Sequence, residues 1–251
     1  MYAFSINFDP ILRKRLKFAF LISIIDDEEM CAMITYDKIK KDPAIKAYIT
    51  AADESLAALG FTEHSFAHVG RVAEDASRIL SELGYGDDMV ELARIAAHLH
   101  DIGNLVNRSE HSQSGAVMAF RILDNMGMPA SDIATVVTAI GNHDEGVGVP
   151  VSPLAAALII ADKSDVRRSR VRNSDMNSFD IHDRVNYSVE SSRLEIDREA
   201  GVISLVLSID TEISSIFDYF EIFLARMLLC RRAADKLGLK FNLFINDQKF
   251  V

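Results

Sequence analysis

The pair His100 and Asp101 stands at the end of an apolar helical run, just before Gly103. An imidazole and a carboxylate that adjoin where a helix ends can turn toward the same metal ion. Such mixed ligands suit Mn, Fe, Co, Ni or Zn better than Ca, with Mg kept as an alternative. The sequence therefore predicts a divalent metal site centred on this pair.

Further ligand candidates stand on the neighbouring predicted helices. His68 lies on the helix before the pair, His111 opens the helix after it, and His143 follows the next helix. Asp162 interrupts an otherwise apolar run, where a carboxylate is costly to bury unless it is paired or bound to a metal. Because loops at helix ends can gather several side chains into one cavity, we expect these residues to converge on the pair.

The elements that must position these residues are mostly helical. The period of the apolar residues, with capping and stop residues, predicts six helices joined by short loops. Their approximate ranges are 42–60, 63–83, 88–103, 111–126, 132–141 and 154–170, with Asp42, Ser131 and Ser152 as the expected caps. Beyond a polar connection at 174–178, the pattern predicts strands at 187–197 and 202–210, a helix at 211–237 and a strand at 239–246.

The predicted fold class is therefore mainly α, a helical bundle followed by a small C-terminal β-β-α-β unit with an antiparallel sheet. Three units are predicted: an N-terminal extension at 1–32, a helical metal-binding domain at 33–175 and a C-terminal α+β subdomain at 183–251. The first unit shares little pattern with the rest, and translation starting at Met30 or Met33 is our hypothesis for it.

Composition excludes several classes of function. The 251 residues are 49% hydrophobic and 25% charged, as in an ordinary globular enzyme. A net charge of −10 argues against a surface for nucleic-acid polymers, which needs a clustered basic face. Cys31 and Cys230 lie far apart and support neither a disulfide framework nor a thiolate metal site. The apolar run at 18–25 is too short to span a bilayer, so we expect a cytoplasmic protein without a membrane partner.

The ordered ligand candidates resemble the signature of the HD superfamily of metal-dependent phosphohydrolases, over roughly residues 63–172. The residues that carry the resemblance are His68, His100, Asp101 and Asp162, with His111 and His143 where two-metal members have extra histidines. Asn104 stands where many members have Lys, so the resemblance does not carry a phosphate-binding or acid role to this position.

The resemblance implies an HD-type helical bundle that holds one or two divalent metals. The first metal would be held by His68, His100, Asp101 and Asp162, and the second by His111 and His143. Asp101 would bridge the two metals and thereby take part in catalysis. Two metals in such a site serve the hydrolysis of phosphate esters.

Basic residues near the presumed ligands are candidates for binding phosphate. Lys163, Arg167 and Arg168 follow closely after Asp162 in an otherwise acidic protein, and arginine forks match phosphate oxygens. A solvated helix end that the helix dipole favours explains the same cluster equally well. Arg108, in the loop after the metal pair, is a comparable candidate.

The remaining polar candidates are weaker. His64 lies one helical turn before a presumed ligand and is either a substrate contact or a surface residue. Asp144 or Glu145 is a candidate acid or base toward the leaving group, with no preference between them. His98 is expected to be structural, and His182 is expected to be incidental.

We expect a phosphomonoesterase or phosphodiesterase acting on a small phosphorylated substrate, a nucleotide or another small molecule. Two other functions use the same ligands: a di-iron oxygenase, as some members of the superfamily are, and a non-catalytic nucleotide sensor. The apolar stripe of the predicted helix at 211–237 is interpreted as core against the sheet, with a homodimer surface as the alternative.

Overall fold

A computed structural model of the chain describes residues 34–251. The predictions made for residues 1–33, which are the N-terminal extension and the alternative starts at Met30 and Met33, lie outside the described residues.

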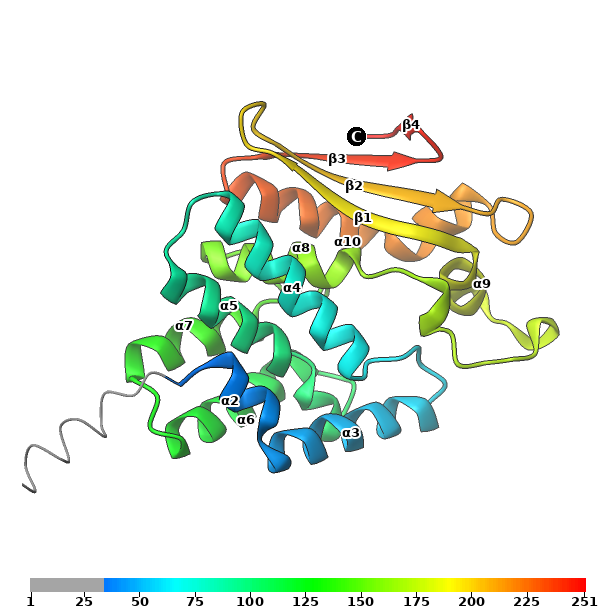
Figure 1. Ribbon diagram of the computed structural model, residues 1–251. Helices are drawn as coiled ribbons and strands as arrows, with labels where there is room; N and C mark the ends of the chain where they lie inside the picture. The colour runs from blue at the N-terminus through cyan, green and yellow to red at the C-terminus, as the bar shows by residue number, and fades with distance from the viewer. Residues whose placement is uncertain (1–33) are drawn as a thin grey trace, which may run out of the picture. The chain divides into compact units, whose positions relative to one another are not determined.

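A bundle of helices forms the larger part of the described chain (Figure 1). Capping residues set several of the helix starts: the side chain of Asp42 accepts the backbone N–H groups of Ala44 and Ile45 at the start of α3, and Ser65 caps α4. The elements of the bundle are α2 Tyr36–Lys41, α3 Pro43–Ala58, α4 Phe66–Glu82, α5 Asp87–Leu99, η1 Ile102–Leu105, α6 His111–Asn125, α7 Ala130–Gly141 and α8 Pro153–Ser164.

Helix α8 lies at the centre of the bundle because nearly all of its residues are apolar. Its side chains from Leu154 to Ala161 are fully buried. It packs against α4, α5 and α7 on the bundle side and against α10 on the other. A helix that is apolar all round is stable only when it is covered on every side.

The C-terminal part adds a small sheet and the helix that covers it. Its elements are η2 Arg168–Arg170, η3 Met176–Ser178, α9 Ile181–Ser188, β1 Val189–Asp197, β2 Val202–Ile209, α10 Ile216–Lys236, β3 Lys240–Ile245 and β4 Gln248–Lys249. The sheet order is β1-β2-β3-β4, with β1 and β4 antiparallel to their neighbours and β2 parallel to β3. In Figure 1, α10 lies between the sheet and the bundle.

The mainly α fold class with a C-terminal β-β-α-β unit is confirmed, but the prediction of an antiparallel sheet is wrong. The sheet is mixed because α10 carries the chain back to the start of β2, so that β3 runs in the same direction as β2. The boundaries of the three predicted units stay a prediction.

Several element boundaries also differ from the expected ones. The sixth predicted helix ends at Ser164 rather than near residue 170, because Asp165 leaves the helical conformation with φ −79° and ψ 72°. Pro129 rather than Ser131 precedes the first turn of α7. Short elements without a long apolar period, α2, α9 and β4, were not predicted.

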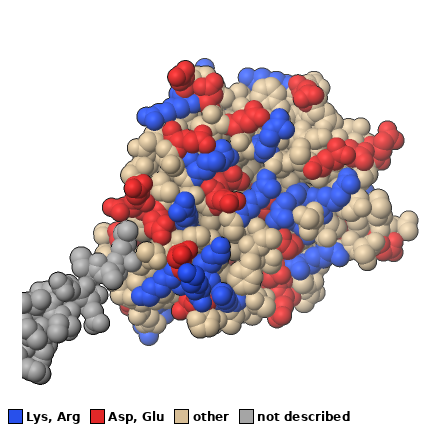
Figure 2. Space-filling view, viewed as in Figure 1, with Lys and Arg blue, Asp and Glu red and all other residues tan. Residues whose placement is uncertain are grey.

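Helix α10 divides its apolar residues between core and surface. Phe223 and Met227 are buried, as expected of the core stripe, whereas Phe217, Leu224 and Leu228 are exposed. A homodimer through this part of the chain stays a prediction. In the face shown in Figure 2, acidic and basic side chains are interspersed. No helix within residues 34–251 has the length and apolar character that a membrane span needs.

Gly103 allows the segment that follows the His-Asp pair to lie directly against α6. A Cβ atom at this position would lie 2.0 Å from the backbone oxygen of His111 and 2.5 Å from the backbone nitrogen of Gly115. Real Cβ atoms do not approach backbone atoms so closely. The close contact of η1 with the start of α6 therefore requires glycine, and it brings His111 next to Asp101.

We predict that Gly103→Ala destabilises the protein by about 2–3 kcal/mol, because the backbone must move apart to admit the methyl group. Urea unfolding measures the difference. Gly70→Ala on α4 is the matched control, since a Cβ there meets nothing within 4 Å, and a helical Gly→Ala change is expected to stabilise by roughly 0.5–1 kcal/mol. Equal effects of the two substitutions would contradict the packing argument.

Candidate metal centre

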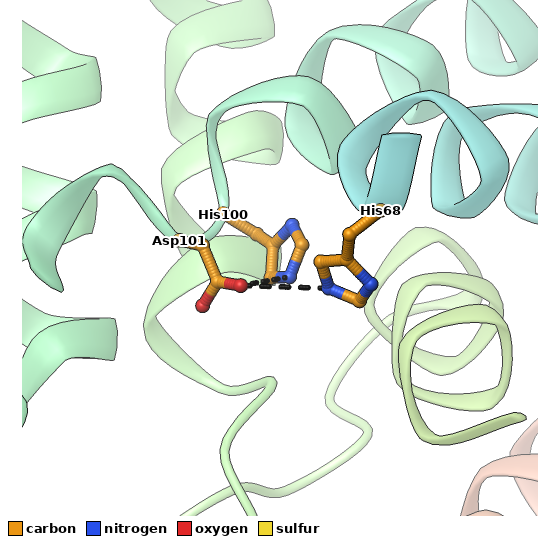
Figure 3. Close-up of side chains that lie close together, drawn as sticks. All are labelled: His68, His100 and Asp101. Carbon is orange, nitrogen blue, oxygen red and sulfur yellow. Dashed lines mark ion pairs between the residues drawn. The ribbon is translucent and has the colours of Figure 1, made fainter. Parts of the chain in front are cut away.

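The six predicted ligands come from five helices and meet in the interior of the bundle. His68 lies on α4, His100 directly follows α5, and Asp162 lies near the end of α8. His111 is the first residue of α6, and His143 lies just after α7. In Figure 3 the side chains of His68, His100 and Asp101 point toward one another.

The two carboxylate oxygens of Asp101 face two different pairs of imidazoles. Its Oδ2 atom lies 3.5 Å from Nε2 of His68 and 3.2 Å from Nε2 of His100. Its Oδ1 atom lies 3.5 Å from Nε2 of His111 and 3.9 Å from Nε2 of His143. A carboxylate placed in this way is able to bridge two metal ions.

Asp162 completes the first of these two groups. Its Oδ1 atom lies 3.3 Å from Nε2 of His68 and 3.7 Å from Nε2 of His100. The first group therefore contains two imidazoles and two carboxylate oxygens, which are the ligands that mid-sized divalent metals accept. Three overlapping sets of these residues have ligand atoms within 4.8 Å of one another.

Hydrogen bonds at the Nδ1 atoms orient all four imidazoles. A carbonyl or carboxylate oxygen only accepts, so each Nδ1 atom carries the proton and each Nε2 atom presents a lone pair to the centre. The Nδ1 acceptors are Oδ2 of Asp165 for His68 at 2.8 Å, Ala97 O for His100 at 2.7 Å, Arg108 O for His111 at 3.1 Å and Ile140 O for His143 at 2.6 Å. This is the usual arrangement of histidines that bind metals.

Two further observations fit a cation at the centre. Within the described part of the chain, the Nε2 atoms of His68 and His100 are buried and have no hydrogen-bond partner. The Nε2 atoms of His111 and His143 lie 3.2 Å apart, although their lone pairs face each other. A positive charge between the two nitrogens removes that repulsion, so the residues present fit metal ions.

The pKa shifts of the residues around the centre favour a positive charge there. Burial lowers the pKa of His100, but Asp101 and Asp162 outweigh burial and raise that pKa to about 10. Burial raises the pKa of Asp101, yet His100 and its neighbours hold it well below the usual range. Burial and then the charges of His100 and Lys163 lower the pKa of His143 to about 3, so this ligand stays neutral. Without a metal, the raised pKa places a second proton on His100, at Nε2, which supplies the positive charge beside the two carboxylates. A metal ion would take the place of that proton and leave the Nε2 lone pair free to bind it.

Asp165, which the sequence analysis did not single out, holds the first histidine in place. This carboxylate is fully buried and accepts hydrogen bonds from His68 and from Nε of Arg167 at 2.7 Å. Nε of Arg71 lies 3.4 Å from Oδ1 of Asp165, the oxygen that also accepts from Arg167. In the sequence, Asp165 could have been identified as a second aspartate three residues after Asp162. Asn104 plays a similar part at the bridge, because its Nδ2 donates to Oδ1 of Asp101 at 3.1 Å.

A cavity of about 360 Å³ opens beside the metal centre. Asp101, Asp162, His111 and His143 line it from within, and His64 lines it as well. The cationic side chains that line it are Arg108, Lys163, Arg170 and Arg226. The structure thus places two predicted cations, Arg108 and Lys163, beside the metal ligands.

Arg167 and Arg168 do not line this cavity. Arg167 pairs with Asp165 and with Glu63, and Arg168 donates to the backbone oxygen of Tyr187 at 2.6 Å and lies over its ring. They point elsewhere because α8 ends before them and the chain turns. Substrate binding by these two arginines stays a prediction without geometric support.

The two candidate acids of the loop after α7 differ in their surroundings. Glu145 pairs with Nζ of Lys163 at 2.6 Å and with Nε of Arg226 at 3.0 Å. Burial raises the pKa of Glu145, but these two cations outweigh burial and hold the pKa below its usual range. Glu145 is therefore an ionised partner of cations and a poor proton donor. Asp144 lies with its Oδ1 3.9 Å from Nε2 of His111.

Several cavity residues were missed by the sequence analysis. Arg226 is the one that the sequence could most easily have indicated, because this charged residue interrupts the apolar face of α10 between Phe223 and Cys230. His182, expected to be incidental, lines the cavity from α9. His98 is buried against the ring of Tyr36, as expected of a structural residue.

Comparisons find a protein family that matches this chain and two known proteins to which it is similar. Residues 65–167 match the family model described as HD domain. An uncharacterized protein of Methanocaldococcus jannaschii is 28% identical, over 69% of this chain and 76% of that protein. The crystal structure of a predicted HD superfamily hydrolase from an uncultured Thermotogales bacterium is 28% identical, covers 52% of this chain and 73% of its own, and has a TM-score of 0.38.

We predict that Asp165→Asn weakens Mn²⁺ or Zn²⁺ binding by about 10-fold or more, because it removes the charge that orients His68. Competition with a chromogenic chelator measures the affinity. The matched control is Asp75→Asn, since Asp75 also lies near Arg71 and pairs with Arg78 but contacts no histidine. If both variants keep the affinity of the unaltered protein, Asp165 does not support the metal centre.

Proposed function

We propose that this protein is a metal-dependent phosphohydrolase that cleaves a phosphate ester of a nucleotide or another small molecule. The match of residues 65–167 to the HD domain family supports this proposal. The observation that carries the proposal is the set of four inward-facing Nε2 atoms around Asp101, next to a cavity lined by cations. Histidines alone would support many reactions, but the cations favour an anionic substrate.

The metal ions are proposed to occupy two positions that share Asp101. The first position would use His68, His100, Asp101 and Asp162, and the second His111, His143 and Asp101. Divalent metals bound there would polarise the phosphoryl oxygens and activate the water that attacks phosphorus.

Lys163 and Arg108 are the side chains best placed to bind the phosphate. Nζ of Lys163 lies 2.8 Å from Oδ2 of Asp162, so a phosphate at the metals meets its charge directly. Arg108 lies with Nη1 3.2 Å from Nε2 of His111 and with its guanidinium over the ring of Phe61. Charged donors on either side of the centre would stabilise the negative charge of the phosphoryl group.

The leaving group needs a proton, and the surroundings of the two acids favour Asp144 over Glu145 for this step. Glu145 is held between Lys163 and Arg226, which keeps it ionised. Asp144 lies nearest to the second group of ligands, at His111. Glu145 is instead proposed to position Lys163.

His64 is proposed to contact the substrate as a neutral group. Burial, followed by the charge of Arg170, holds the pKa of His64 well below its usual range. Its Nδ1 donates to the backbone oxygen of Thr62 at 2.7 Å, which leaves Nε2 as an acceptor.

We predict that the purified protein releases phosphate or cleaves a phosphodiester in a screen with Mn²⁺, Ni²⁺, Co²⁺, Mg²⁺ or Fe²⁺. Asp101→Ala should lower kcat/KM by about 1,000-fold or more, because it removes the bridging carboxylate and with it several kcal/mol of charge stabilisation. The exposed Asp124→Ala on α6 is the control. Full activity of Asp101→Ala would contradict the proposed mechanism.

The same screen separates the alternative functions. A coloured di-iron centre formed in air, without hydrolysis in any metal, would favour the oxygenase. Tight nucleotide binding without turnover in every metal would favour the sensor.

We also predict that the protein binds two metal ions per chain and that His111→Ala retains one. The loss is partial because His68, His100 and Asp162 lie on the other side of Asp101. Metal analysis after gel filtration counts the ions, and His182→Ala is a control, since this histidine lines the cavity without belonging to the ligand sets. One ion in both the unaltered protein and His111→Ala would mean a mononuclear site.

A further inference from the structure

One wall of the metal-site cavity comes from outside the HD domain. Helices α9 and α10 contribute His182, Asp183, Asn186, Phe223 and Arg226 to the lining. None of these residues lies within the matched range, which ends at residue 167. The wall therefore needs its own explanation.

Arg226 is held in one orientation at this wall. Its Nε pairs with Glu145 at 3.0 Å, and its guanidinium carbon lies 4.6 Å from the ring centroid of Phe223. Among residues 34–251, no hydrogen bond engages its two Nη groups. A guanidinium fixed by one ion pair and one stacking contact keeps two donors for an anion in the cavity.

Glu145 links this arginine to the metal centre. It joins Arg226 to Lys163, and Lys163 in turn contacts Asp162. The two cations thus stand in a row that begins at a metal ligand and leads outward along the wall. A phosphate bound at the metals would therefore meet Lys163 first and Arg226 on its outer side.

Helix α9 presents hydrogen-bond acceptors to the same cavity. Nδ2 of Asn186 donates to the backbone oxygen of His182 at 2.8 Å, which leaves Oδ1 of Asn186 as an acceptor. The carboxylate of Asp183 makes no hydrogen bond or ion pair within the described residues. His182 is exposed, Asp183 is half-buried and Asn186 is buried, so α9 runs from the mouth of the cavity inward.

A ligand that pairs with the hydrogen-bond acceptors of this wall must carry hydrogen-bond donors. An ammonium group would pair with Asp183, but the cavity already holds four cationic side chains and, in the proposed function, two divalent metals. Together these outweigh the carboxylates of the lining and repel a further cation. Hydroxyl groups donate without a charge and fit both conditions.

We propose that Arg226 binds a phosphate oxygen and that Asp183 and Asn186 accept hydrogen bonds from the alcohol part of the substrate, which makes the preferred substrate a phosphate ester of a polyhydroxylated alcohol such as a sugar or nucleoside. This inference rests on the proposed phosphohydrolase function. The HD domain would perform the hydrolysis, and α9 and α10 would select the ester.

The test compares ribose 5-phosphate with p-nitrophenyl phosphate, which lacks alcohol hydroxyls, using the Mn²⁺-loaded protein. The measured quantity is the kcat/KM for ribose 5-phosphate divided by the kcat/KM for p-nitrophenyl phosphate. Asp183→Ala should lower this ratio by about 10-fold, because one charged acceptor is lost. The exposed Asp235→Ala on α10 should keep the ratio. Arg226→Gln should raise KM for both substrates by about 10-fold, and Arg226→Lys should restore KM in part. The control Arg232→Gln, at an exposed position of α10, should leave KM unchanged.

A binding experiment separates this inference from the proposed function. Calorimetry of the Mn²⁺-loaded protein compares a non-hydrolysable phosphonate analogue of ribose 5-phosphate with methylphosphonate. The unaltered protein should bind the ribose analogue at least about 10-fold more tightly, and Asp183→Ala should reduce that preference. Preference in binding without phosphate release in any metal would overturn the phosphohydrolase and leave the role of the wall intact. Phosphate release with an unchanged ratio and unchanged preference in Asp183→Ala would overturn the role of the wall.

Discussion

Two ionised carboxylates, Asp101 and Asp162, are enclosed in the interior of a helical bundle, and the rest of the structure answers that constraint. A buried charge is tolerated only with a partner of opposite sign. Lys163 supplies one for Asp162, whereas Asp101 accepts a hydrogen bond from Asn104 and faces the Nε2 atoms of four imidazoles. Divalent metal ions would supply the balancing charge, and the helices around the site each place a candidate ligand.

The sequence predicts the bundle, and the convergence of the six candidate ligands within it, because both depend on local patterns. Apolar periods mark the helices, and the helix ends mark where His100, His111 and His143 occur. The Asp in the apolar run of α8 was informative for a physical reason, since only a paired or metal-bound carboxylate belongs there. The structure brings all six candidates together.

What the sequence could not predict depends on the path of the chain in three dimensions. The parallel pairing of β2 with β3 follows from where α10 delivers the chain, which no local pattern records. Arg167 and Arg168 stand close to Asp162 in sequence but turn away, because α8 ends at Ser164. Arg226 lies far away in sequence and reaches the cavity because α10 packs on α8. Nearness along the chain was thus a poor guide to which cations line the cavity.

The division of labour between the bundle and the C-terminal helices has a physical basis in how each group is held. The histidines of the candidate metal centre are oriented mostly by nearby backbone carbonyls, such as those of Ala97 and Ile140, which side-chain changes elsewhere do not remove. Arg226 and Asn186 are instead positioned by contacts made within or across the C-terminal helices. If the proposed function holds, substitutions in α9 and α10 would alter which ester is bound while the candidate metal ligands keep their geometry. Glu145 would be the exception, because it contacts both Arg226 and Lys163, so a change there would disturb ester selection and hydrolysis together.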